Sequence, residues 1–156
     1  MSHKALAVLF TLTLCMSVVS AQTKSDPLWQ KALKIQREAI VVDTHADTPS
    51  LILDGGLDIG DPNAKSHLNI KRMKEAGLSA EFFVSYISKS FVPDNRSAFR
   101  AIEMMDAIKH DIVERYPNDF LFATSVADIR AAKKQGKIAA LIGIEGGHAI
   151  EDSLRL

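Results

Sequence analysis

The stretch that decides the fold is Ile138 to His148, "IAALIGIEGGH". Its first seven residues form a near-continuous apolar run bounded by glycine, which is typical of a strand buried on both faces of a parallel sheet. Upstream, Ser125 to Asp128 has the pattern of a capping box, with Asp where Glu is usual, and predicts a helix that runs to Gly136. Because helices alternate with buried strands in α/β proteins, this stretch favours an α/β architecture with a parallel sheet.

The sequence before residue 125 repeats this alternation. Asp26 and Pro27 suit the N-cap and first positions of a leading helix. Apolar spacings of three and four residues predict a short helix around Met73, which Gly77 ends, and a long helix from Phe99 to Tyr116. Runs of β-branched and aromatic residues predict three more strands, at 40–42, 80–87 and 120–123.

These predictions give four strands after one leading helix, in a chain of 156 residues. A closed (β/α)8 TIM barrel needs about 250 residues, so on that fold the chain would hold about the first half. Residues 148–156, "HAIEDSLRL", resemble the beginning of a further helix. An open sheet of four strands is the alternative architecture.

The first 21 residues are predicted to be a signal peptide, which leaves residues 22–156 as the barrel domain. Lys4 lies in a short positive region, an apolar run follows from Ala5 to Val19, and the small residues up to Ala21 suit a cleavage site. The protein is therefore expected to be periplasmic or secreted, with a retained membrane anchor as the alternative.

Composition narrows the classes of partner. The chain carries 19 basic and 19 acidic residues, so no charge excess points to nucleic acid. Its only cysteine, Cys15, lies within the predicted signal peptide, and the mature chain has no disulfide framework. Stability is therefore expected to come from a packed core or from metal.

A first candidate site lies in Ile40 to Pro49, "IVVDTHADTP". Asp43, His45 and Asp47 alternate at the end of a predicted strand, so they would project to one side if the extended backbone persists. The carboxyl ends of strands are where α/β folds place active sites. Imidazole nitrogen and carboxylate oxygen suit zinc or another borderline divalent ion. The alternative is a surface loop in which the acids cap turns.

A second candidate is Glu145, which directly follows the buried strand and precedes two glycines. Glycine permits a sharp turn and the close approach of a ligand, and neither glycine pattern of phosphate-binding loops is present. Glu145 could converge with His45 and Asp47 on a shared ion. Asp43 and His148 could hydrogen-bond to these ligands without binding the ion themselves, as carboxylates often orient metal-bound imidazoles. A turn or structural role is the alternative for both residues.

Three segments together resemble the membrane dipeptidase (renal dipeptidase, peptidase M19) family. They are "VVDTHADTP", "MKEAGLSAEFFVSYI" and, about a hundred residues after the first, "IGIEGGHAIEDSL". The resemblance covers residues 28–156, and the order and distance of the motifs make it specific.

The resemblance implies a zinc-dependent metallodipeptidase on a (β/α)8 barrel, acting on dipeptides that include some with a D-residue at the C-terminal position. It also implies that His45 and Asp47 bind one zinc ion and that Glu145 bridges two. A hydroxide between the two ions would attack the peptide carbonyl. The family's remaining ligands and substrate-binding residues lie beyond Leu156, so the chain alone is expected to be inactive, and the full-length protein could form a homodimer.

Two other functions stay open. Another TIM-barrel metal-dependent amidohydrolase would usually carry His-x-His at the end of the first strand, where this chain has Asp47 in the third position. An exported non-catalytic binding protein would use the same acids only to cap turns. Zinc uptake in His45→Ala and Glu145→Ala variants distinguishes that third class from the first.

Overall fold

The computed structural model describes residues 26–156. Residues 36–156 form one compact unit that contains the whole sheet, and the first helix begins in the other unit. The helices are α2 (Pro27–Glu38), α3 (Thr48–Gly55), α4 (Ile70–Glu75), α5 (Ser97–Ala107) and α6 (Val126–Lys134), and the strands are β1 (Val42–Ala46), β2 (Ala80–Tyr86), β3 (Phe120–Phe122) and β4 (Ile138–Glu145). Short 3-10 segments span Lys89–Phe91 and Gly147–Ile150, and a π-helical segment spans Ile108–Glu114.

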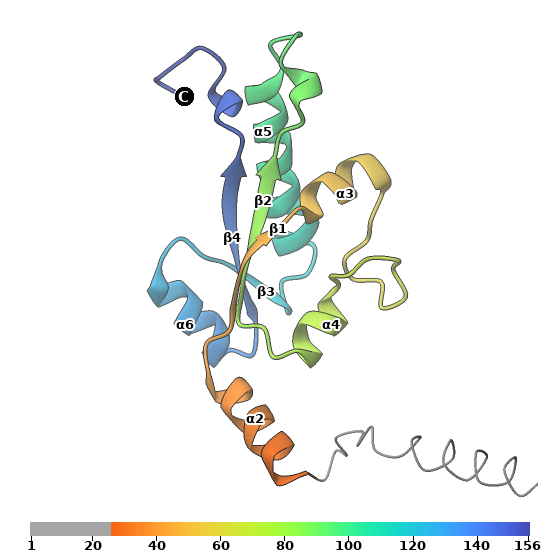
Figure 1. Ribbon diagram of the computed structural model, residues 1–156, viewed down its shortest axis with the longest axis vertical. Coiled ribbons are helices and arrows are strands. Elements are labelled where there is room, and N and C mark those ends of the chain that lie inside the picture. Colours follow the sequence, from red (N-terminus) through yellow and green to blue (C-terminus); the bar gives the residue numbers. More distant parts are fainter. Residues whose placement is uncertain (1–25) are drawn as a thin grey trace, which may run out of the picture. The chain divides into compact units, whose positions relative to one another are not determined.

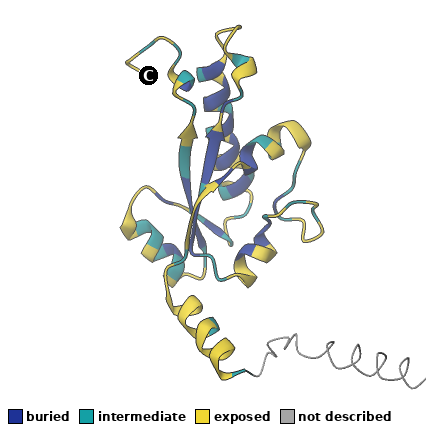
Figure 2. Ribbon diagram, in the orientation of Figure 1, coloured by how far each residue is buried: buried dark blue, intermediate teal, exposed yellow. Residues whose placement is uncertain are grey.

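The four strands form one parallel sheet in the order β1-β2-β4-β3 (Figure 1). The central strands β2 and β4 are largely buried, whereas β1 at the edge is exposed over four of its five residues (Figure 2). A parallel α/β architecture, predicted from the buried run at residues 138–144, is therefore confirmed.

Helices cover both faces of the sheet. Successive strand residues point to opposite faces, and Phe83 and Ala140 pack with α4 and the π-helical segment, whereas Ala139 and Leu141 pack with Ala132 of α6. The connection from β3 to β4 runs back across the sheet, opposite to the earlier connections. Because such crossovers are right-handed, α6 must lie on the face opposite to α4 and α5.

Two predicted helix starts are confirmed by their hydrogen bonds. The backbone N–H of Leu28 donates to Oδ1 of Asp26 at 2.8 Å. At the start of α6, the backbone N–H of Asp128 donates to Oγ of Ser125, and the Ser125 hydroxyl donates to the Asp128 carboxylate. These bonds satisfy amide groups that a helix leaves unpaired in its first turn.

The first strand differs from its prediction. It spans Val42–Ala46 rather than residues 40–42, so His45 belongs to the strand itself. It is exposed rather than buried because it forms an edge of the sheet. Pro49 lies in the first turn of α3, where the missing N–H of proline leaves no bond unmade.

Two further expectations need correction, and the order of the strands is a new finding. The helix predicted from Phe99 to Tyr116 changes to π-helical hydrogen bonding at Ile108. Residues 148–156 form a 3-10 segment and turns rather than the start of an α-helix. Strand β3 pairs only with the first three residues of β4 and lies at the edge of the sheet beyond β4, so the order across the sheet differs from the order along the chain.

The predicted signal peptide, residues 1–21, lies outside the described residues. The domain boundary at residue 22 likewise remains a prediction. Within residues 26–156, no helix is both long enough and apolar enough to cross a bilayer.

Candidate metal centre

An irregularity in β1 decides which side chains reach the site. Asp43 pairs with Glu81 and Ala46 pairs with Phe83, so three steps along β1 match two steps along β2. One extra residue is therefore inserted, which is a β-bulge. The bulge shifts the alternation of side chains, so Asp43 stays on the face of Glu81 and Phe83 while His45 turns to the other face. The prediction that all three motif side chains project to one side is wrong for Asp43.

The structure brings His45, Asp47 and Glu145 together. Nε2 of His45 lies 3.3 Å from Oδ1 of Asp47 and 3.1 Å from Oε2 of Glu145. One potential ligand atom from each residue lies within 4.8 Å of the other two, and residues 26–156 contain no second group of this kind. All three side chains are about half exposed, at 51%, 53% and 48%. The cluster is therefore open to a ligand from solvent.

Asp47 occupies the N-cap position of α3 but does not cap the helix. Its side chain makes no hydrogen bond to the backbone N–H groups of the first turn. The carboxylate is turned toward the imidazole of His45 instead. An N-cap aspartate normally gains about 1 kcal/mol from its cap bond. An acid that only ended the strand and began the helix would be expected to make that bond, so the geometry disfavours a simple capping role.

Glu145 is the last residue of β4, and the residue two positions before it on the same face of the strand is a glycine, Gly143. A depression of about 460 Å³ at this end of the sheet is lined by six residues of β1, β2 and β4: Thr44, His45, Val84, Gly143, Ile144 and Glu145. A Cβ at Gly143 would lie 3.3 Å from the side chain of Val84. Glycine there leaves room for His45 on β1 and Glu145 on β4 to meet above β2.

The backbone turns sharply after Glu145, as the two glycines predict. Gly146 has φ of 102°, a region that L side chains rarely adopt, whereas Gly147 is not among the residues with positive φ. The turn carries the chain into the 3-10 segment, and Nε2 of His148 then lies 2.8 Å from the carbonyl oxygen of Ile87.

The two predicted supporting residues act on the backbone. His148 bonds the carbonyl of Ile87 and is not part of the cluster. Oδ1 of Asp43 accepts the backbone N–H of His45 at 3.1 Å, so it fixes the main chain at the bulge. That Asp43 also orients the ring of His45 stays a prediction.

The donor set fits zinc. Two ligands bound at 2.0–2.1 Å to a tetrahedral zinc ion lie about 3.3 Å apart, close to the 3.1 and 3.3 Å that separate Nε2 of His45 from the two carboxylate oxygens. One imidazole and two carboxylates are ordinary zinc ligands, and three protein ligands leave a position open for water or a further ligand.

Sequence reasoning missed a second acidic residue near β1. Glu81 on β2 is fully buried, at 0% exposure, and neither carboxyl oxygen has a hydrogen-bond partner among residues 26–156. Burial, and next the charge of Asp43, raise the pKa of Glu81 to about 8. The signal was a lone acid within the apolar run "AEFFVSYI", where strand alternation alone could not reveal its surroundings.

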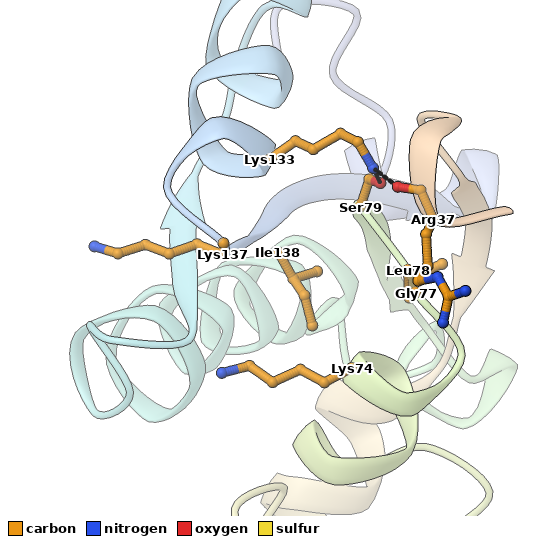
Figure 3. Close-up of a pocket in the computed structure, with 9 residues that line it drawn as sticks. Arg37, Lys74, Gly77, Leu78, Ser79, Lys133, Lys137 and Ile138 are labelled. Carbon is orange, nitrogen blue, oxygen red and sulfur yellow. Dashed lines mark hydrogen bonds between the residues drawn. The ribbon is translucent and has the colours of Figure 1, made fainter. Parts of the chain in front are cut away.

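A basic cavity of about 290 Å³ lies at the amino ends of β2 and β4, away from the cluster (Figure 3). Its lining includes Lys74, Lys133 and Lys137. The ammonium group of Lys133 donates to the carbonyls of Arg37 and Ala39 and to Oγ of Ser79. Lys133 thus joins three backbone segments, which is a structural role.

The carboxyl ends of a parallel sheet carrying one imidazole and two carboxylates define a candidate α/β metal-binding protein. The chain belongs to the membrane dipeptidase family (peptidase family M19), whose sequence profile matches residues 29–156. The resemblance noted in the three motifs is thereby confirmed.

Individual relatives agree with this family. A protein from Clonostachys rogersoniana named dipeptidase verJ is 27% identical over 150 residues, which cover 87% of this chain and 38% of that protein. The probable dipeptidase PvdM from Pseudomonas aeruginosa has a similar structure, with a TM-score of 0.68 at 18% identity over 80% of this chain and 32% of that one. Dipeptidase AC, a metallopeptidase of family M19, gives a TM-score of 0.56 at 21% identity over 70% and 36%.

These likenesses confirm the expected fold class, part of a barrel-type α/β fold. The chain spans 38% of the length of dipeptidase verJ and 32% of that of PvdM. The arrangement seen in residues 26–156 therefore corresponds to a portion of those proteins.

Proposed function

We propose that this chain supplies part of the active site of a zinc-dependent dipeptidase, with His45, Asp47 and Glu145 as metal ligands. The observation that carries the proposal is the approach of His45 Nε2 to Glu145 Oε2, at 3.1 Å, from two different strands. Membership in the membrane dipeptidase family and the name of the relative from Clonostachys support dipeptides as substrates.

Each residue has a defined task in this proposal. His45 would hold the metal through Nε2 and Asp47 through Oδ1, and the carboxylate of Glu145 would provide the third ligand. The open depression above Val84 and Gly143 admits the substrate next to these ligands. Zinc held by these residues would lower the pKa of a bound water and would polarise the peptide carbonyl.

We also propose that residues 1–156 by themselves bind zinc weakly and hydrolyse no dipeptide, because residues 26–156 bring only three ligand side chains together. Measurable hydrolysis of Gly-Leu or Ala-D-Ala by a polypeptide of these residues contradicts this. Export through residues 1–21 is proposed as well, and the N-terminal residue of the mature protein, read by mass spectrometry, tests it.

The alternatives remain distinguishable. Another metal-dependent amidohydrolase would bind zinc through the same residues but act on non-peptide amides or lactones. A non-catalytic binding protein would not need zinc. The N-cap position of Asp47, whose side chain leaves the helix uncapped, is the observation that disfavours the second alternative.

The test is zinc binding by the whole protein, measured by competition with a chromogenic chelator, together with hydrolysis of Gly-Leu. Changing Glu145→Gln or His45→Ala is expected to weaken zinc binding by at least about 10- to 100-fold. Mutating a residue that only hydrogen-bonds to a metal ligand already lowers metal affinity by about that factor. Both variants should also lose dipeptide hydrolysis.

The chain offers a matched control. His110 pairs with two acids on its own helical stretch, through Nδ1 2.6 Å from Oε2 of Glu114 and through Nε2 3.2 Å from Oδ1 of Asp106. These residues do not form a group of three converging ligand atoms among residues 26–156. Glu114→Gln and His110→Ala should leave zinc affinity unchanged within about twofold. Equal zinc affinity in Glu145→Gln and Glu114→Gln contradicts the proposed metal centre.

A further inference from the structure

Glu81 has no role in the proposed metal chemistry, yet it lies on β2, the strand that pairs with the one carrying His45. It pairs in register with Asp43 on β1 and with Ala140 on β4. Because Glu81 and Phe83 are two residues apart, both project to the face on which α4 and the π-helical segment pack, opposite to the metal centre. Its carboxyl group is therefore enclosed within the protein and does not face the open depression.

Within residues 26–156, no basic group neutralises Glu81. Asp43 is the charged group that acts on it, and that charge has the same sign. Helices α3 and α5 pack against β2, and the buried cation of α5, Arg100, is already bonded to Asp54 and Glu103. A buried carboxylate without a counter-charge is strongly unfavourable. Glu81 therefore holds a proton at neutral pH.

A protonated carboxyl group is a hydrogen-bond donor, and the carboxylate of Asp43 is the neighbouring acceptor. Asp43 lies opposite Glu81 on the neighbouring strand, and only its Oδ1 is engaged, by the backbone N–H of His45. Directly opposed side chains of adjacent strands come within reach of one another. A turn of the Glu81 side chain toward Asp43 would satisfy both groups.

We propose that Glu81 is a positioning residue: a neutral carboxylic acid that donates its proton in a hydrogen bond to Asp43, so that Asp43 in turn holds the bulge that presents His45. The chain of contacts runs from Glu81 to Asp43 to the backbone of His45. It rests on the proposed function only in that His45 is a metal ligand. The tests of the contacts themselves are therefore made on metal-free protein.

The first test compares the pH dependence of unfolding in the wild type and Glu81→Gln, by urea titration of the metal-free whole protein between pH 5 and pH 9. The pKa of Glu81 is raised from 4.5 to about 8 on folding, so within this window the folded state holds one proton more than the unfolded state. Stability from this group is present at low pH and is lost as pH rises toward 8.

The wild-type folding equilibrium constant should fall about tenfold per pH unit relative to Glu81→Gln, and the ratio should level off above pH 8. Asp43→Asn removes the neighbouring charge, so in that background the ratio should level off at lower pH. A ratio independent of pH means that Glu81 is ionised or neutralised in the folded protein, and overturns the proposal. A levelling point that does not move in Asp43→Asn overturns the pairing with Asp43.

The second test reads the bulge itself through hydrogen exchange of the His45 amide, normalised to the Ala139 amide, which donates to Ser79 within the sheet. Gln can donate to Asp43, so Glu81→Gln should keep exchange within about threefold of wild type. Leu cannot donate, so Glu81→Leu should accelerate His45 exchange about tenfold or more. Equal exchange in the two variants overturns the proposal.

Zinc binding then separates this inference from the proposed function. With both correct, Glu81→Leu weakens zinc affinity and Glu81→Gln restores it. If Glu145→Gln leaves zinc affinity unchanged while the exchange difference persists, the metal centre is wrong and the contact between Glu81 and Asp43 stands. If the exchange difference is absent while Glu145→Gln abolishes zinc binding, the reverse holds.

Discussion

Gly146 is expected to be the most sensitive glycine next to the metal centre. It follows Glu145 directly, and its φ of 102° and ψ of 107° lie in a region that side chains with a Cβ rarely occupy. A Cβ built there would lie 2.6 Å from Cε1 and 3.0 Å from Nδ1 of His148. Changing Gly146→Ala therefore strains the backbone and pushes the imidazole ring away.

The magnitude follows from two contributions. Placing alanine in a sparsely populated backbone region costs about 1–3 kcal/mol. Displacing the ring breaks the 2.8 Å hydrogen bond between His148 Nε2 and the Ile87 carbonyl, which costs about 1 kcal/mol. We expect Gly146→Ala to lower the free energy of unfolding by about 2–4 kcal/mol relative to a neutral glycine substitution.

Gly147→Ala is that neutral substitution. Gly147 does not have positive φ, and no atom lies within 4 Å of a Cβ built on it. Both variants restrict the unfolded chain alike, by about 0.4–1 kcal/mol, so the difference between them isolates the folded-state cost. Urea unfolding of metal-free protein, followed by circular dichroism, measures it.

A third variant separates the backbone strain from the loss of the His148 hydrogen bond. In a His148→Ala background the ring is absent, so adding Gly146→Ala should cost only the backbone strain of about 1–3 kcal/mol. Zinc affinity should also fall in Gly146→Ala, because the turn sets the direction of Glu145. A difference below about 0.5 kcal/mol between Gly146→Ala and Gly147→Ala would refute the reasoning, because surface substitutions already vary by that amount.

Two predictions concern the scaffold. Phe83 is fully buried, and its ring meets that of Phe120 edge to face with the ring centres 5.9 Å apart. Phe83→Ala should therefore lower the free energy of unfolding, measured in urea, by about 3–5 kcal/mol, whereas Phe122→Ala, at a 39% exposed position, should lower it far less. Similar costs for the two variants would contradict the described core. Ser125→Ala removes the acceptor for the Asp128 N–H and should cost about 1 kcal/mol, and an unchanged urea midpoint would show that the cap contributes nothing.

The local elements could be predicted because their causes lie close together in the chain. The leading helix begins at Asp26 and α6 begins at Ser125, each through a side chain that bonds an amide two or three residues later. The run from Ile138 to Ile144 is apolar throughout, and it became a central parallel strand whose first four residues are buried. The kinds of ligand were readable for the same reason, since a metal selects its donors by chemistry.

The bulge could not be read from the sequence. Perfect alternation in "DTHAD" predicted one shared face, but pairing with β2 inserts an extra residue and separates Asp43 from His45. The order of the strands was equally hidden, because β3 follows β2 in the chain and yet lies beyond β4. Register and strand order depend on segments that are far apart in sequence, and no local pattern records them.

The sequence by itself determined the α/β class, the start of each capped helix and the chemical identity of the candidate ligands. Only the tertiary structure decided that His45 and Glu145 meet at 3.1 Å, that Asp47 leaves its helix uncapped, and that Glu81 is enclosed beside another acid. Helix signals and donor types are properties of neighbouring residues. Convergence, burial and the protonation of a carboxyl group are set by which distant strands come to lie side by side.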